Sequence, residues 1–314
     1  MLLTILHTMR SFFENRRWVN TGILLLIFAI LQTLSYGQSG KVENSIFWKI
    51  SGKDAQKPSY LFGTYHVLNN GFLEDVPNVN KIYNESGNVV VETELDSSKI
   101  MQVLFMAMMK DKKISELISA EDYKLVSTEV QNASGATMDM FNQFKPNFVT
   151  VMLTMAYNQK ENKELLSKYK GQPIDGYLAS NARKNKKTVS TFESMQEQMD
   201  ILFGHESVEK QAEQLVEFIK SKDEMIKSQV ELTNMYLQQD LTGMYKMFTK
   251  YAKQFGDADY LLDDRNIKWM EKLPSLLSTG DQFIAVGAMH FVGKNGLIKL
   301  LREKGYTVTP VSLK

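Results

Sequence analysis

Two of the four histidines stand in the same four-residue frame, Gly-x-x-His, near opposite ends of the chain. The first copy is Gly63–His66 and the second is Gly287–His290. An imidazole can act as a general acid or base near neutral pH, and it is the commonest metal ligand in proteins. A single histidine beside an apolar run is usually a structural residue, but the repeated frame predicts one site that uses both rings.

A short apolar run precedes each copy of the frame, at residues 60–62 and 283–286. Such runs are typical of buried strands. Open sheets of α/β type place their functional groups just beyond the carboxyl ends of strands. Because glycine has no Cβ, the backbone can turn sharply there and come close to whatever the ring holds. We therefore expect His66 and His290 to converge on folding.

An acidic residue is needed to complete such a site, and Glu92 is the best candidate. It follows the apolar residues of a strand predicted at 88–95, and Glu94 lies on the same face because strand side chains repeat every two residues. Catalytic metals usually have three protein ligands and one open position. Glu92 is thus predicted to be a metal ligand or a base, and Glu94 a further catalytic group. The alternative is that Glu92 or Glu94 merely ends the strand in solvent.

Arg265 is the candidate cation of the site. An arginine can clamp a carboxylate or stabilise negative charge that develops on an attacked carbonyl or phosphoryl oxygen. Taken alone, the pair Asp264-Arg265 is also typical of the start of a surface helix. We predict a catalytic role for Arg265, provided that folding brings it to the histidines.

The composition excludes several classes of site. The chain has no cysteine, so disulfides, thiolate metal ligands and cysteine nucleophiles are ruled out. Any metal must be held by histidine and carboxylate groups, which suits Zn, Mn, Fe or Co better than soft Cu(I). Lys+Arg 37 against Asp+Glu 36 gives a net charge of +1, which argues against nucleic acid as a partner. No serine elbow, Walker motif or dinucleotide fingerprint follows a strand.

The first 37 residues have the pattern of a signal peptide. Arginines at positions 10, 16 and 17 precede an apolar run at 22–34, and small residues at 35–37 form a cleavage site after Gly37. We expect an exported protein, periplasmic or secreted, with no membrane span after cleavage. An uncleaved signal anchor is the alternative, and Met9 is an alternative start to Met1.

The remaining pattern predicts an α+β fold. Strands are expected at 45–50, 59–62, 88–95, 188–192, 282–286 and 306–311, and helices fill most of residues 97–255. The expected architecture is a mixed β-sheet core with flanking helices and a large helical insertion between the two Gly-x-x-His strands. We predict one domain over 38–314. The stretch 206–253 is expected to be a helical hairpin that bends near Gly243.

Several motifs together resemble the TraB/PrgY/GumN family, which includes the Tiki proteases. The resemblance extends over about residues 45–314 in the order of its motifs. The motifs are Leu61–His66, Val90–Glu92, Arg265–Trp269 and Gly287–Gly293, followed by Gly305–Val308. The resemblance implies a metal-dependent, peptidase-like site on a mixed sheet. By this resemblance, the site is formed by His66, His290, Glu92 and Arg265. The supporting residues are Asp175, Glu193 and the two frame glycines, Gly63 and Gly287.

The Tiki and TraB/PrgY branches carry carboxyl-terminal membrane segments, whereas this sequence is similar to the soluble, exported GumN-like branch. Our leading hypothesis is an exported metal-dependent hydrolase that binds a divalent metal, Mn, Co or Zn, as its cofactor. Its substrate is expected to be a peptide or protein. The alternative hypothesis is a non-catalytic protein of the bacterial envelope that binds and sequesters a peptide or metal in the same site.

Overall fold

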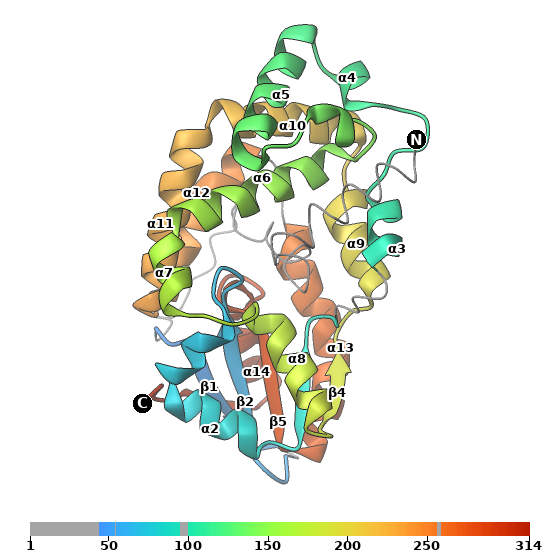
Figure 1. The fold of residues 1–314 in the computed structure, drawn as a ribbon. Coiled ribbons are helices and arrows are strands. Elements are labelled where there is room, and N and C mark those ends of the chain that lie inside the picture. The colour runs from blue at the N-terminus through green and yellow to red at the C-terminus, as the bar shows by residue number, and fades with distance from the viewer. Residues whose placement is uncertain (1–43, 54, 95–99, 256–258) are drawn as a thin grey trace. The chain divides into compact units, whose positions relative to one another are not determined.

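The computed structural model describes residues 44–53, 55–94, 100–255 and 259–314. The predicted signal peptide lies outside these residues. The chain divides into two compact units (Figure 1). In the described residues, a helical unit comprises 100–163 and 195–230, and a sheet unit comprises 44–94, 164–194 and 231–314. None of the described helices is both long enough and apolar enough to cross a membrane.

The sheet unit contains a six-stranded mixed sheet with the order β4-β3-β5-β2-β1-β6. Parallel pairs join β4 to β3, β3 to β5 and β5 to β2, and antiparallel pairs join β2 to β1 and β1 to β6. The strands predicted at 45–50 and 59–62 form an antiparallel hairpin, and the predicted α+β fold is confirmed. The strands are β1 (Phe47–Ser51), β2 (Ser59–Thr64), β3 (Asn88–Val91), β4 (Thr188–Thr191), β5 (Gln282–Gly287) and β6 (Thr307–Pro310).

The parallel pairing of β2 with β5 puts the two Gly-x-x-His frames side by side. Gly63 is opposite Val286 and Thr64 is opposite Gly287, so both frames leave the sheet at the same edge. Figure 1 shows the blue β2 next to the orange β5, although they come from opposite ends of the sequence. All six residues of β5 are buried, as expected for a strand in the middle of a sheet.

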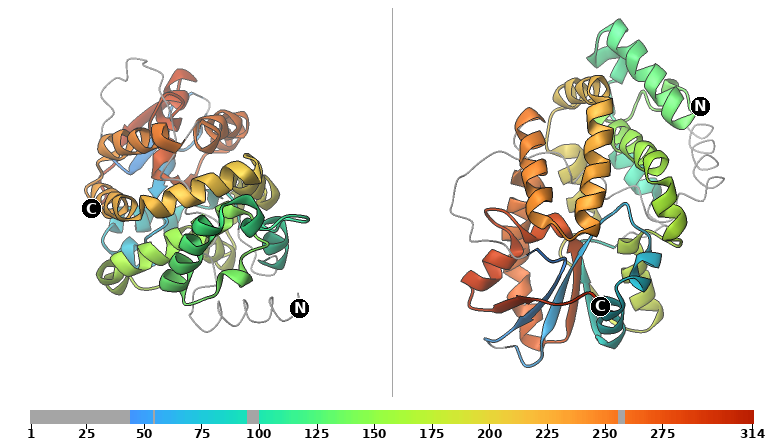
Figure 2. Two further views of the ribbon diagram at one scale, coloured as in Figure 1. Left: turned by 90° about the horizontal axis from the view of Figure 1, so that it is seen from above. Right: turned by 90° about the vertical axis from the view of Figure 1, so that its left-hand side faces the viewer.

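Helices cover both faces of this sheet (Figure 2). On one face, Tyr83 contacts Phe283 edge-on and donates a hydrogen bond to the carbonyl of Leu178. On the other face, the guanidinium of Arg302 lies over Trp48. The first face is covered by α2 (Pro77–Glu85) and α8 (Ile174–Lys184), and the second by α13 (Asp263–Thr279) and α14 (Leu297–Glu303).

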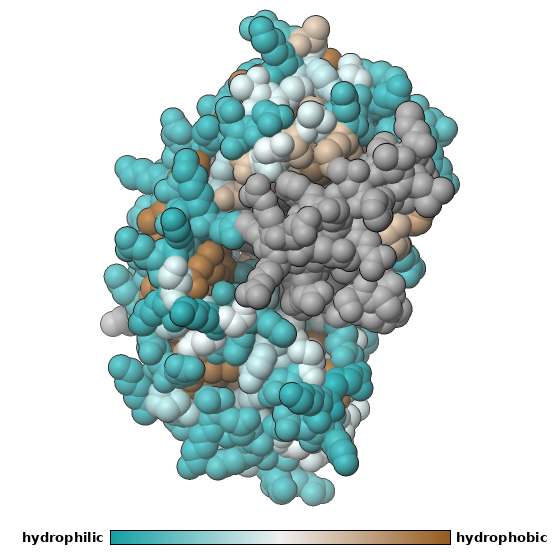
Figure 3. Space-filling model, viewed as in Figure 1, coloured by the Kyte–Doolittle hydropathy of each residue, from teal (hydrophilic) through white to brown (hydrophobic). Residues whose placement is uncertain are grey.

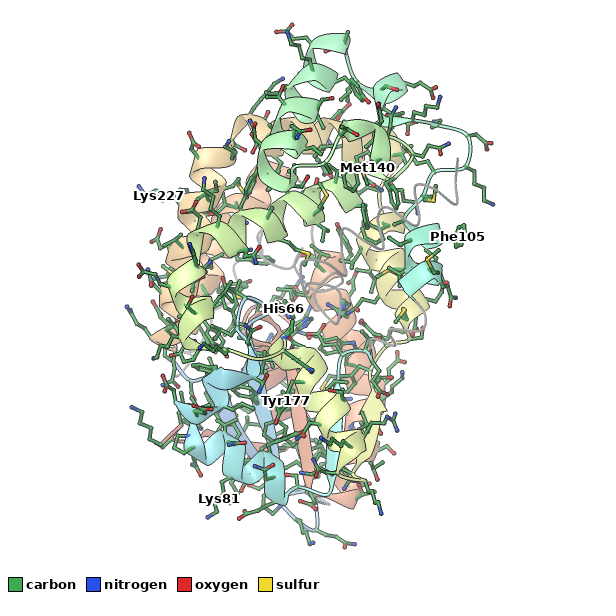
Figure 4. All side chains as sticks on the ribbon, viewed as in Figure 1. His66, Lys81, Phe105, Met140, Tyr177 and Lys227 are labelled. Carbon is green, nitrogen blue, oxygen red and sulfur yellow. The ribbon has the colours of Figure 1, made fainter. Side chains whose placement is uncertain are left out.

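The outer helix faces carry polar side chains, as amphipathic helices require. Lys81 of α2 is exposed, and Figure 4 shows it pointing away from the sheet. Hydrophilic residues cover most of the visible surface of the sheet unit in Figure 3. The apolar side chains lie instead between the helices and the sheet, where Phe47, Phe62 and Phe283 are fully buried.

The helical unit packs α5 (Ala120–Ser134), α6 (Pro146–Glu161) and α10 (Val208–Lys220) against one another. It also contains α3 (Ile100–Met106), α4 (Ile114–Leu117) and α9 (Met195–Gly204). This unit and the short α7 (Lys163–Lys168) account for much of the predicted helical insertion.

The prediction of a helical hairpin over 206–253 is wrong in the number of helices and in the positions of the breaks between them. Three helices occupy the stretch: α10, α11 (Lys222–Leu237) and α12 (Leu241–Phe255). The last break lies at residues 238–240, where Gln239 has a φ of 59°. The carboxylate of Asp240 accepts the backbone N–H of Gly243, so this glycine belongs to the first turn of α12 and does not bend the chain.

Candidate active site

Both histidine rings reach the space beside Gly287. An ideal Cβ built on Gly287 would lie 3.7 Å from Nε2 of His66 and 3.6 Å from Cδ2 of His290. The same point would lie 3.3 Å from Oε1 of Glu92. Figure 4 shows His66 just beyond the carboxyl ends of β2 and β5. The two frames and the acidic residue after β3 thus meet at one place.

The two frame glycines provide space, and neither has a positive φ. An ideal Cβ on Gly63 would lie 2.9 Å from Cα of Ala288, so the absence of a side chain lets the first frame pack on the second. Gly287 has a φ of −51°, which any residue can adopt. Its missing side chain leaves room between His66, His290 and Glu92. Gly63 is therefore needed for close packing of the two frames, and Gly287 leaves room for the side chains around it. Neither glycine is needed for the sharp turn that we expected.

Glu92 is held by hydrogen bonds at both oxygens. Its side chain is 5% exposed, directly after the end of β3. Oε1 accepts the backbone N–H of Gly287 at 2.7 Å, and Oε2 accepts Nη2 of Arg265 at 2.7 Å. Nε2 of His290 is 3.8 Å from Oε1. The carboxylate is therefore fixed beside both frames.

The guanidinium of Arg265 has all five of its N–H donors matched to acceptors of the protein. Nε donates to Oε1 of Glu193 at 2.6 Å, and Nη2 donates to Oε2 of Glu193 and to Glu92, each at 2.7 Å. Nη1 donates to the carbonyl of Leu261 and to Nε2 of His290, each at 3.2 Å. Burial lowers the pKa of Arg265, but Glu92 and Glu193 outweigh it and raise the pKa, so the group stays charged.

His290 is fixed in one neutral form. The side-chain amide of Asn266 donates to the carbonyls of His290 and Asn295, so its Oδ1 accepts Nδ1–H of the ring at 2.7 Å. Nε2 then has a lone pair, which accepts the N–H of Arg265. Burial and the nearby charge of Arg265 lower the pKa of His290 well below its usual value. The ring also contacts Trp269, with centroids 4.3 Å apart.

His66 has the opposite electrostatic surroundings. Its Nδ1 lies 2.8 Å from Oδ2 of Asp175, near the start of α8, and Thr64 donates to Oδ1 of the same carboxylate at 2.5 Å. Burial lowers the pKa of His66, but the charge and hydrogen bond of Asp175 outweigh it, and the net pKa is raised. Burial raises the pKa of Asp175, but His66 and Thr64 outweigh it and lower the pKa. These groups form an ion pair when His66 is protonated.

Eight of the nine site residues predicted from sequence lie at or beside this cluster, and Glu94 lies apart from it. Both oxygens of Glu94 accept hydrogen bonds from Arg183, and the two side chains are 33% and 55% exposed. The reason is that β3 ends at Val91, so the two-residue repeat of a strand does not continue to Glu94.

Three further residues support the site and had no predicted role. Thr64 contacts Asp175, Asn266 fixes His290, and Trp269 donates Nε1–H to Glu193 at 2.8 Å. The guanidinium of Arg265 also lies over the ring of Trp269, with Cζ 4.8 Å from the ring centre. A helical spacing of four residues from Arg265 to Trp269 was the available signal, because it puts both side chains on one face of α13.

The sequence predicts a divalent metal held by histidine and carboxylate groups. The donor types are suitable, but Nε2 of His290 and Oε2 of Glu92 each accept an N–H of Arg265. Nε2 of His290 has a single lone pair, so its hydrogen bond with Arg265 leaves only His66 and Glu92 as candidate ligands, fewer than the three that a catalytic ion usually has. Among the described residues, no group of three histidine or acidic residues is arranged to hold an ion. The residues as arranged do not fit a bound metal.

The mixed sheet and the paired Gly-x-x-His frames beyond its strands define a class of proteins. Comparison of this sequence with models of known families identifies that class. The chain matches the sequence model of the TraB/PrgY/gumN family over residues 46–310, and it belongs to that family. No curated protein and no solved structure was found to match it.

Proposed function

We propose that this protein is a hydrolase of peptide-type bonds in which His66 is the general base and acid. The observation that carries this proposal is the convergence at Gly287, where Nε2 of His66 and Oε1 of Glu92 lie 3.7 and 3.3 Å from the ideal Cβ position of this glycine. A water molecule or a substrate atom held between these two polar atoms would contact both groups. Peptides are the favoured substrate because of the family resemblance.

His66 has the surroundings that a general base requires. Neutral His66 takes a proton from the attacking water at Nε2, while Nδ1–H points to Asp175. The carboxylate of Asp175 then stabilises the imidazolium, which returns the proton to the leaving amine. Histidines whose surroundings move their pKa values apart usually have different roles. By this criterion His66 exchanges the proton and His290 stays neutral.

Glu92 orients the attacking water through Oε1 in this proposal. The hydrogen bonds from Gly287 and Arg265 keep its carboxylate in place. The sequence also predicts that Arg265 stabilises the oxyanion directly. That role stays a prediction, because it requires one of the five N–H groups to leave its present acceptor.

We place this activity outside the cytoplasm, on the basis of the leader pattern at residues 1–37. Intact-mass measurement of the exported protein tests this part. A mass that begins after Gly37 supports export with cleavage. A mass that begins at Met1 or Met9 contradicts cleavage and supports the signal-anchor alternative.

The activity is tested with a peptide library and the variants His66→Gln and His205→Gln. His205 is exposed in the helical unit and serves as the matched control. Loss of a general acid–base group should lower kcat by about 10²- to 10⁴-fold, and His205→Gln should keep full turnover. Unchanged turnover in a folded His66→Gln protein would refute the proposal. Stoichiometric binding of peptides without any cleavage would support the sequestering alternative.

A further inference from the structure

The site already contains a fixed cation. The guanidinium of Arg265 is 2% exposed and contacts two carboxylates, those of Glu92 and Glu193, which are 5% and 1% exposed. Removing a carboxylate from water is costly unless a cation and hydrogen bonds compensate. Arg265 supplies both, so Glu92 and Glu193 do not need a metal ion to be stable as anions.

The same guanidinium occupies two of the atoms that a metal would need, and it uses the single lone pair of Nε2 of His290. Nη1 and Nη2 of Arg265 donate to Nε2 of His290 and to Oε2 of Glu92, two of the three expected ligands. Asn266 makes this arrangement specific, since it accepts Nδ1–H and leaves Nε2 of His290 as an acceptor. A divalent ion at these atoms would both lose ligands and be repelled by the positive charge next to it.

We propose that Arg265 is the resident cation of this site and takes the place of a divalent metal, with Asn266 as the positioning residue that keeps His290 an acceptor. The proposal rests on the hydrogen-bonded donor set, and it extends the proposed function by naming the group that balances the buried carboxylates. Removal of the guanidinium should convert the site into a metal site. The carboxylates would then lack their cation, and the potential ligands Glu92, Glu193, His66 and His290 would no longer share the site with it.

The test measures metal uptake and not turnover. Wild type, Arg265→Ala and Arg183→Ala are dialysed against Mn²⁺, Co²⁺ or Zn²⁺, and then their metal content and thermal unfolding are measured. Arg183 is the matched control, because it also binds a glutamate through two hydrogen bonds but is exposed. We expect no stoichiometric uptake and no metal-dependent shift of Tm in wild type and Arg183→Ala.

For Arg265→Ala we expect uptake of one ion per chain and a Tm that rises with metal concentration. The double variant Arg265→Ala with His66→Gln should lose most of this gain. One bound ion in wild type, lost in Glu92→Gln or His290→Ala, would overturn the proposal. A folded Arg265→Ala protein that takes up no metal would overturn its second part, the conversion into a metal site.

If Arg265→Ala does not fold, the wild-type measurement still decides the first part. Nitrogen NMR of wild type gives a second readout: His290 should have a protonated Nδ1 and an unprotonated Nε2, unchanged by added Zn²⁺. A zinc-dependent shift of Nε2 would contradict the proposal. These results do not depend on hydrolysis, so a failure to cleave any peptide would remove the proposed function and leave the inference about Arg265 intact.

Discussion

Oδ2 of Asp175 lies 2.8 Å from Nδ1 of His66, although 109 residues separate them in the chain. The corresponding nitrogen of His290 faces the amide oxygen of Asn266 instead, at 2.7 Å. Two histidines in the same local frame thus have an anionic partner in one case and a neutral partner in the other. This difference supports the proposed role of His66 in proton transfer and the role of His290 as a fixed acceptor, and it leads to the predictions below.

The two histidines should titrate on opposite sides of the usual pKa of 6.5. The pKa of His66 is raised, so its ion pair with Asp175 stabilises the fold fully below pH 6.5, and this contribution is lost as the pH rises through the raised pKa. The pKa of His290 is lowered, so its contribution is full above pH 6.5 and declines as the pH falls below that value.

Imidazole NMR of wild type measures both titrations, and the variants His66→Gln and His290→Gln assign the signals. We expect the His66 signal to titrate above pH 6.5 and the His290 signal to stay that of a neutral ring while the protein is folded. A His290 signal that titrates above that of His66 would contradict the assignment.

Asp175→Asn should reduce turnover without abolishing it. The amide keeps a hydrogen-bonding group near His66 but removes the charge that stabilises the imidazolium, so kcat should fall by roughly 10- to 100-fold, the size of effect known for carboxylates that orient metal-bound histidines. The acidic limb of the pH–rate profile should also move to lower pH, because the pKa of His66 loses its main raising cause. A change of KM alone, with kcat and the pH profile unaltered, would show that Asp175 only binds substrate.

The buried ion pair between Arg265 and Glu193 should be far more important for stability than an exposed pair of the same type. Glu193→Gln leaves a buried guanidinium with one carboxylate fewer, and it should lower the free energy of unfolding by about 3–5 kcal/mol. The control is Glu94→Gln, which breaks the exposed pair with Arg183 and should change it by about 0–1 kcal/mol. Urea unfolding measures both, and equal effects would contradict the structural importance of the buried pair.

The two frame glycines should respond differently to alanine. In Gly63→Ala the new Cβ would lie 2.9 Å from Cα and Cβ of Ala288, so overpacking should lower the free energy of unfolding by about 1–3 kcal/mol. In Gly287→Ala the closest contact is 3.3 Å, to Oε1 of Glu92, which is tight but longer than the contacts of Gly63, so stability should fall less than in Gly63→Ala while turnover falls, because the methyl group lies beside His66 and Glu92. Thermal unfolding combined with a turnover assay separates these effects. Full activity in Gly287→Ala would show that the space is not used by the substrate.

Much of the fold could be predicted from the sequence, because local patterns carry that information. The run Phe283–Val286 is apolar and uninterrupted, as a strand buried on both faces requires, and it lies in β5. Most of the predicted helical stretch 97–255 is helical, including α8 at its residues 174–184, and glycine at position 305 provides the positive φ, 89°, that follows α14. Helix boundaries in 206–253 could not be predicted, since the break at Gln239 and Asp240 depends on a capping contact that a general helical pattern does not contain.

The sequence by itself determined which residue types were available for chemistry: two framed histidines, a glutamate after a strand, and an arginine. Only the tertiary structure decided their partners. Arg265 meets Glu92 across 173 residues of sequence, and Glu94, two positions further along, pairs with Arg183 instead. The physical reason is that charge partners are chosen by how separate helices and strands pack, and local spacing does not specify that packing.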